Sequence, residues 1–185
     1  MDALDDIRSK VVACTKCELC KTRTNAVPGK GSHGADIVFV GEAPGRSEDL
    51  SGEPFVGAAG KKLSAVLEKH GIARDSVYIT NVVKCRPPNN RVPTQKERDS
   101  CINYLQGEID AINPKVVCIL GNTASNSILG QAEITKNHGQ VVEKDGRRYF
   151  LTFHPAATIY NQELNAVIDA DMGRLAEIVS KMRDA

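Results

Sequence analysis

Short apolar runs alternate with segments of helical periodicity along most of the chain. The runs are rich in β-branched residues, too short for helices and bounded by glycine, asparagine or proline, which predicts buried strands. We expect strands at residues 37–40, 77–83, 116–120, 140–142 and 149–153. The last two flank Lys144-Asp145-Gly146 and are therefore predicted to form a hairpin or strand pair.

Apolar residues at helical spacing predict five helices, the third of which begins with a capping box formed by Thr94 and Glu97. They cover residues 4–14, 59–70, 94–112, 122–129 and 164–182. Because strands and helices alternate, we expect an α/β fold with a mostly parallel sheet covered on both faces. The sequence contains no internal repeat and no long linker, so a single domain over residues 1–185 is predicted.

Composition limits the class of protein. With 41% hydrophobic and 25% charged residues, the chain has the balance of a soluble globular protein. No apolar run approaches the ~20 residues of a membrane span, and the N-terminus is acidic where a signal peptide would be basic. We therefore expect no membrane association and an intracellular, cytoplasmic location, near the nucleoid if the partner is DNA. The net charge of +1 argues against indiscriminate nucleic-acid binding. Lys84, Arg86 and Arg91 bracket one loop, but such charges are usually solvated.

Six cysteines are the first chemical signal. In a reducing compartment, metal binding or burial is more common than a disulfide framework. Cys14 and Cys17 form a Cys-x2-Cys pair, and Cys85 and Cys101 follow with fifteen residues between them. Four thiolates from two distant segments could bind zinc or an iron–sulfur cluster, and the wide second spacing slightly favours the bulkier cluster. Buried free thiols are the alternative, and Cys20 could replace a ligand or be a partly buried thiol.

Polar residues follow the buried strands. Glu42 lies in a tight Gly-Glu-Ala-Pro-Gly turn after the first strand, and Phe55 lies in a second glycine- and proline-containing loop. Asn81 and His154 end two later strands. Ligands of open α/β sheets bind at the carboxyl ends of strands, so these residues are candidates for one site. The structural alternatives are a core position for Phe55, a turn for Asn81 and a packing role for His154.

Taken together, these motifs resemble the family-four, iron–sulfur uracil-DNA glycosylases of the uracil-DNA glycosylase superfamily. The resemblance covers the chain from about Cys14 to about Asn161, with the motifs in the family's order. Its motifs are residues 41–45, 48–49, 52–57, 78–88 and 154–156.

This resemblance implies a fold and a cofactor. The fold is a three-layer αβα sandwich with a four-stranded parallel central sheet, so the hairpin near residue 146 should lie at an edge. The cofactor is a [4Fe–4S] cluster on Cys14, Cys17, Cys85 and Cys101, with Cys20 as a non-ligand.

The resemblance also implies an activity in DNA repair. The enzyme would flip uracil out of single- or double-stranded DNA and hydrolyse its N-glycosidic bond, leaving an abasic site and free uracil. Glu42 and His154 would be catalytic: Glu42 orients water and stabilises charge on the sugar, and neutral His154 donates to uracil O2. Asn81 would donate to O4 and accept from N3–H, a pattern that cytosine reverses.

The remaining positions concern binding. The resemblance implies that Ala43, Glu48 and Phe55 contact the substrate, with Glu48 excluding the methyl group of thymine and Phe55 stacking on the base. Arg86 and Arg91 would face phosphates. We expect a monomer.

Two other functions explain part of the pattern. A non-enzymatic iron–sulfur or zinc protein that binds DNA or transfers electrons would use the cysteines but not Glu42, Asn81 or His154. A related superfamily member could capture uracil-DNA covalently or excise deaminated purines. The loop Arg86–Arg91 contains no histidine, which argues against covalent capture.

Overall fold

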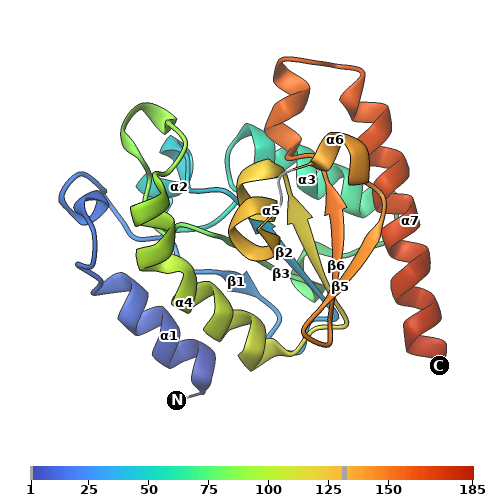
Figure 1. The fold of residues 1–185 in the computed structure, drawn as a ribbon, viewed down its shortest axis with the longest axis horizontal. Coiled ribbons are helices and arrows are strands. Elements are labelled where there is room, and N and C mark those ends of the chain that lie inside the picture. The colour runs from blue at the N-terminus through green and yellow to red at the C-terminus, as the bar shows by residue number, and fades with distance from the viewer. Residues whose placement is uncertain (1, 131–132) are drawn as a thin grey trace.

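A six-stranded sheet forms the centre of the computed structural model, which describes residues 2–130 and 133–185 (Figure 1). The strand order is β1-β3-β2-β4-β6-β5. The strands are β1 (Lys30–Gly31), β2 (Ile37–Gly41), β3 (Tyr78–Asn81), β4 (Val116–Leu120), β5 (Val141–Lys144) and β6 (Arg147–Thr152).

The four central strands β3, β2, β4 and β6 are parallel, as the resemblance implied. Strands β1 and β5 add antiparallel edges, and β5 pairs with β6 as the predicted hairpin. Strand β1 was not predicted, because two exposed residues, Lys30 and Gly31, carry no detectable alternation. The carboxyl ends of β4 and β6 point to the upper edge in Figure 1.

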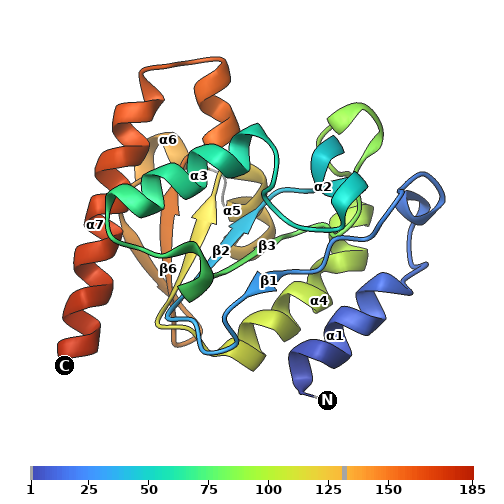
Figure 2. The same cartoon turned by 180° about the vertical axis from the view of Figure 1, so that it is seen from behind.

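Helices cover both faces of the sheet, which confirms the αβα layers (Figures 1 and 2). Their bounds are α1 (Ala3–Val12), α2 (Arg46–Ser51), α3 (Ala58–Lys69), α4 (Gln95–Ile112), α5 (Asn122–Leu129), α6 (Ile134–Asn137) and α7 (Leu164–Asp184). The predicted capping box of α4 is present at Thr94. The short helices α2 and α6 were missed because each has too few residues to show a period.

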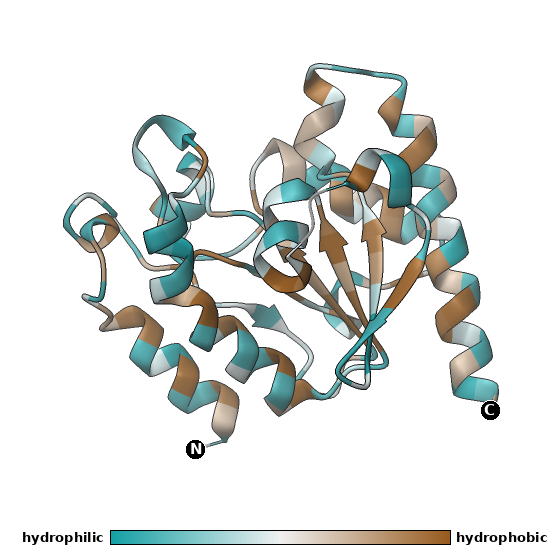
Figure 3. Cartoon of the chain, viewed as in Figure 1, coloured by the Kyte–Doolittle hydropathy of each residue, from teal (hydrophilic) through white to brown (hydrophobic). Residues whose placement is uncertain are grey.

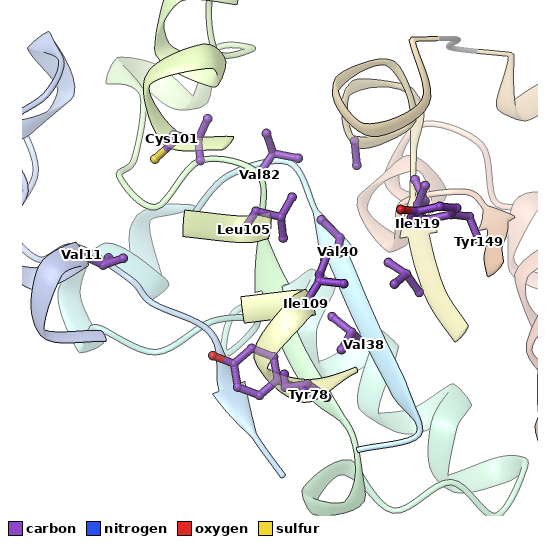
Figure 4. Packing of buried hydrophobic residues seen from close by; sticks show 14 of the residues in the cluster. Val11, Val38, Val40, Tyr78, Val82, Cys101, Leu105, Ile109, Ile119 and Tyr149 are labelled. Atoms are coloured by element: carbon purple, nitrogen blue, oxygen red, sulfur yellow. The ribbon is translucent and has the colours of Figure 1, made fainter. Parts of the chain in front are cut away.

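Alternation along each strand divides the core into two layers. Val38 and Val40 of β2 face the layer formed with α1 and α4, where Leu105 and Ile109 point toward them (Figure 4). Phe39 faces the opposite layer, formed with α3 and α7. Hydropathy follows this division, since the central strands are hydrophobic while the outer faces of the helices carry polar residues (Figure 3). Among the described residues, no helix is both long and apolar enough to cross a membrane.

One charged pair lies wholly inside the protein. The Lys84 Nζ atom is 2.6 Å from Glu108 Oε2, and each side chain is 1% exposed. Lys84 also donates to Thr80 Oγ1 and to the Asn81 carbonyl oxygen, while Glu108 accepts from the Gly29 backbone N–H. Grouping Lys84 with the solvated loop charges was therefore wrong. Its charge is compensated by hydrogen bonds, which a buried charge requires.

Candidate active site

The candidate site is centred on Gly41, where β2 ends beside β3. Gly41 is paired with Asn81 in the parallel register, and Val82 N–H donates to the Gly41 carbonyl oxygen at 3.0 Å. A Cβ atom on Gly41 would lie 2.6 Å from Asn81 Oδ1 and 2.6 Å from Phe55 Cζ. The Asn81 and Phe55 side chains therefore occupy the space that a side chain at position 41 would need, so only glycine fits there.

Most of the predicted substrate residues line one cleft of about 300 Å³. Its wall includes Ala43, Glu48, Phe55, Asn81 and His154. The ring centroids of Phe55 and His154 are 5.5 Å apart, with the rings tilted by 32°. The structure thus brings together side chains from the ends of three strands, from α2 and from the loop after α2.

Asn81 presents an unused acceptor to this cleft. The residue is 1% exposed, yet its Oδ1 atom has no hydrogen-bond partner within residues 2–130 and 133–185. Leaving a buried acceptor unpaired costs about 1–3 kcal/mol. A ligand that inserts an N–H group into the cleft would recover this cost, so the geometry favours a flat, hydrogen-bonding ring.

His154 is held as a neutral donor. Its Nδ1 atom accepts from the Ala156 backbone N–H at 3.1 Å, so the ring proton of the neutral form lies on Nε2. Burial lowers the pKa of His154 to about 4, an effect that the negative charge of Glu48 partly opposes. At neutral pH the site therefore contains an uncharged imidazole that can donate one hydrogen bond.

Glu48 also has a structural role, which the sequence did not indicate. Its Oε1 atom accepts from the backbone N–H groups of Val56 and Gly57, at 3.2 and 3.0 Å. Phe55, the residue before them, has a φ of 52°, in the left-handed region that non-glycine residues rarely adopt. Glu48 therefore stabilises the loop that presents the Phe55 ring.

Glu42 lies in an adjoining cleft of about 330 Å³ that shares Ala43 and His154 with the first. Thr123 Oγ1 donates to Glu42 Oε2 at 2.6 Å, which fixes one carboxylate oxygen. Asn90 lines both clefts. Thr123 and Asn90 were missed because a single polar residue in a helix start or loop has no distinctive pattern.

The two predicted DNA-binding arginines are both engaged on the loop after β3. Arg91 makes two hydrogen bonds to Glu97, at 2.9 and 2.8 Å, and its side chain remains 43% exposed. Arg86 Nε donates to Asn90 Oδ1 at 2.8 Å. Arg91 and Asn90 line the Glu42 cleft, so this loop forms part of its rim.

The cysteines converge in a different place. Cys14, Cys17, Cys85 and Cys101 line one small cavity, and Cys20 lines it too. Two N–H groups point at sulfur atoms there: Arg23 Nη1 donates to Cys85 Sγ at 3.2 Å, and the Lys84 backbone donates to Cys101 Sγ at 3.4 Å.

This donor set fits a cluster better than a single ion. No three His, Cys, Asp or Glu side chains in residues 2–130 and 133–185 are close enough to hold one metal ion. Zinc would need its sulfur ligands about 2.3 Å from one centre, whereas cluster ligands bind different irons and stand further apart. Burial raises the pKa of Cys17 and Cys85, and that of Cys101 to about 11, so loss of their protons requires nearby positive charge. The geometry does not select four thiols among the five.

Comparison with known proteins gives one consistent family. Residues 28–172 match the family described as "Uracil DNA glycosylase superfamily". A "Type-4 uracil-DNA glycosylase" of Archaeoglobus fulgidus is 46% identical, covering 98% of this chain and 96% of its own. Another of the same name, from Thermotoga maritima, is 40% identical over 97% and 96%. A "Type-5 uracil-DNA glycosylase" of Pyrobaculum aerophilum is 31% identical over 82% of each chain. The chain therefore belongs to the uracil DNA glycosylase superfamily and, within it, to the type-4 family.

Proposed function

We propose that this protein hydrolyses the N-glycosidic bond of deoxyuridine in DNA and releases free uracil. The observation that carries the proposal is the buried, unpaired Oδ1 of Asn81, in a cleft with an aromatic ring and a neutral imidazole. The names of the type-4 relatives support it. It acts as a monomer on single- or double-stranded DNA.

Recognition of the base uses Phe55 and Asn81. Extruding a nucleotide from a duplex costs a few kcal/mol. Stacking on an aromatic ring returns about 1–3 kcal/mol per base. The Asn81 amide accepts from uracil N3–H and donates to O4, whereas cytosine offers the opposite arrangement and would leave both groups unpaired.

Bond cleavage uses His154 and Glu42. As the bond between C1′ and N1 breaks, its electron pair moves to the uracil, and the Nε2–H group of His154 stabilises the charge at O2. Glu42, held by Thr123 through one oxygen, can orient water with the other and stabilise the cationic sugar. Water oxygen then bonds to C1′ and loses a proton, and the uracil anion takes one up.

Glu48 combines the loop support described above with a steric role. Its carboxylate lines the cleft, where it takes up space that the methyl group of thymine would need. Ala43 lines the same cleft.

Cys14, Cys17, Cys85 and Cys101 are the proposed ligands of a [4Fe–4S] cluster. Bound there, such a cluster would supply positive charge to the thiolates and a covalent link between the N-terminal segment and the loop after β3. The loop carries the half-buried Arg86 and the exposed Arg91, which are proposed to contact phosphates.

Strand scission at a single defined base tests the proposal. Oligonucleotides with uracil, thymine, hypoxanthine or xanthine at one position are treated with the protein and then with alkali, which breaks abasic sites. Scission at uracil and not at thymine is expected. Scission only at the purines would instead support excision of deaminated purines, and no scission would support a non-enzymatic binding protein.

A further inference from the structure

The Arg74 side chain forms hydrogen bonds to the backbone of the loop that carries Phe55. Its Nη2 atom donates to the carbonyl oxygens of Pro54 and Phe55, at 2.9 and 2.7 Å. Its Nη1 atom donates to Ser64 Oγ at 2.6 Å and to the Gly60 carbonyl oxygen at 3.3 Å. One guanidinium thus connects the loop to the first turns of α3.

The loop needs this support because its backbone is strained at Phe55, where φ is 52°. Helix α3 also presses on it, since a Cβ atom on Gly60 would lie 1.9 Å from the Phe55 carbonyl oxygen. Glu48 accepts from the N–H groups of Val56 and Gly57 on one side, while Arg74 donates to carbonyl groups on the other. The two side chains together satisfy the polar groups that fix this conformation.

Arg74 lies outside the uracil cleft. It lines a separate groove of about 1100 Å³, which Phe55 also borders. The residues that line the cleft include Phe55 but not Arg74. Any effect of Arg74 on the base must therefore pass through the loop.

The four hydrogen bonds of this side chain suit an arginine better than a lysine. In the described part of the chain, the hydrogen bonds of Arg74 go to three backbone carbonyls and one hydroxyl rather than to a carboxylate. A planar guanidinium can reach several acceptors in fixed directions, whereas a lysine ammonium is a compact point charge. Burial lowers the pKa of Arg74, and the charges of Glu53 and Glu48 partly offset that effect.

We propose that Arg74 is a positioning residue for Phe55, holding the loop so that the ring lies ready to stack on the flipped base. This inference rests on the proposed function. Substitution of Arg74 should remove much of the stabilisation that stacking of the base on Phe55 provides. The rate of uracil excision should then fall by a factor of about 5 to 150.

A double-mutant cycle tests the proposal. Single-turnover excision of uracil is measured for the wild type, Arg74→Met, Phe55→Ala and the double variant, each with its thermal unfolding curve. We expect each single variant to be at least about fivefold slower, and the double variant to be no slower than Phe55→Ala. Arg147→Met is the matched control, because Arg147 also donates to a backbone carbonyl, that of Ile109, but at the amino end of β6. It should lose stability and keep the wild-type rate.

The contrary outcomes are distinct. A wild-type rate in folded Arg74→Met, or independent effects that multiply in the double variant, would overturn the role of Arg74. If Arg74→Met does not fold, Arg74→Lys keeps the charge but not the four contacts, and a wild-type rate for it would overturn the proposal equally. A wild-type protein that leaves uracil-DNA intact would overturn the proposed function and this inference with it.

Discussion

Phe55, Asn81 and His154 lie far apart in the sequence and meet in one cleft, where each is prepared before any ligand arrives. Phe55 has a strained backbone, and Asn81 has a buried oxygen with no partner in the part of the chain that the structure describes. His154 has one ring nitrogen that accepts from the Ala156 N–H group. Each of these conditions costs stability or restricts freedom. Such costs are typical of residues retained for binding or catalysis rather than for folding.

The protonation state of His154 should depend on pH in an unusual range. Because burial lowers its pKa to about 4, from an ordinary 6.5, the imidazole should stay neutral well below pH 6.5. The unfolded chain binds this proton more tightly, so the contribution of His154 to stability is complete above pH 6.5 and declines as the pH falls toward 4. A ¹⁵N titration of the ring should show Nε2 protonated at neutral pH, with a midpoint near 4. A midpoint at 6.5 or above would contradict the assignment.

Single residues differ in how far the sequence predicts them. Asn81 and His154 were predictable because each follows a buried strand, and strand ends are where ligands of this fold class bind. Thr123 acts through its hydrogen bond to Glu42, and Arg74 through its hydrogen bonds to the Phe55 loop and α3, at positions that only the folded chain brings together. No periodicity marks such a contact.

At the scale of elements, the loop after β3 is joined to helix α4 by the buried pair of Lys84 and Glu108. The pair satisfies the Asn81 carbonyl group, and the Lys84 backbone donates to Cys101, so it lies between the candidate site and the cysteines. Removing one member of a buried pair leaves an uncompensated charge.

Substitution of this pair should therefore be strongly non-additive. Lys84→Met alone is expected to lower the free energy of unfolding by about 3–5 kcal/mol. Lys84→Met with Glu108→Gln removes both charges and should recover most of that loss, since the amide can still accept from Gly29 N–H. Chemical denaturation measures both variants. A double variant no more stable than Lys84→Met would show that the charge pair is not the main contribution.

Elements were predictable where they are long and buried. The four parallel strands and the long helices follow from apolar runs and helical spacing. Strand β1 and helices α2 and α6 are short, and backbone pairing or local turns hold them rather than an amphipathic pattern. The position of β5 at the sheet edge came from the resemblance rather than from its residues.

At the scale of the whole molecule, the cysteine cavity joins the segment after α1 to the loop after β3 and to α4. A cluster there would restrain the segment after α1 and the loop after β3, and this loop lines the Glu42 cleft. Its loss should loosen this region while leaving the central sheet intact.

Cysteine substitutions test this arrangement. Cys101→Ser is expected to remove the visible absorption and the iron content of the purified protein, and to weaken its DNA affinity. Cys20→Ser should retain both, as a non-ligand does. Cys118→Ala is the control, because that thiol is fully buried in β4 and lies outside the cavity. Full iron content in Cys101→Ser, or its loss in Cys20→Ser, would contradict the proposed ligands.

Uracil excision from DNA is the activity proposed for the cleft between Phe55, Asn81 and His154. Its most direct measurement is free uracil released from a uracil-containing oligonucleotide by the wild type and by His154→Ala, alongside thermal unfolding of both. His33→Ala, at an exposed histidine paired with Asp2, serves as the control. We expect release by the wild type and by His33→Ala, and a rate about 10²–10³-fold lower for His154→Ala at similar stability. Normal release by folded His154→Ala, or none by the wild type, would contradict it.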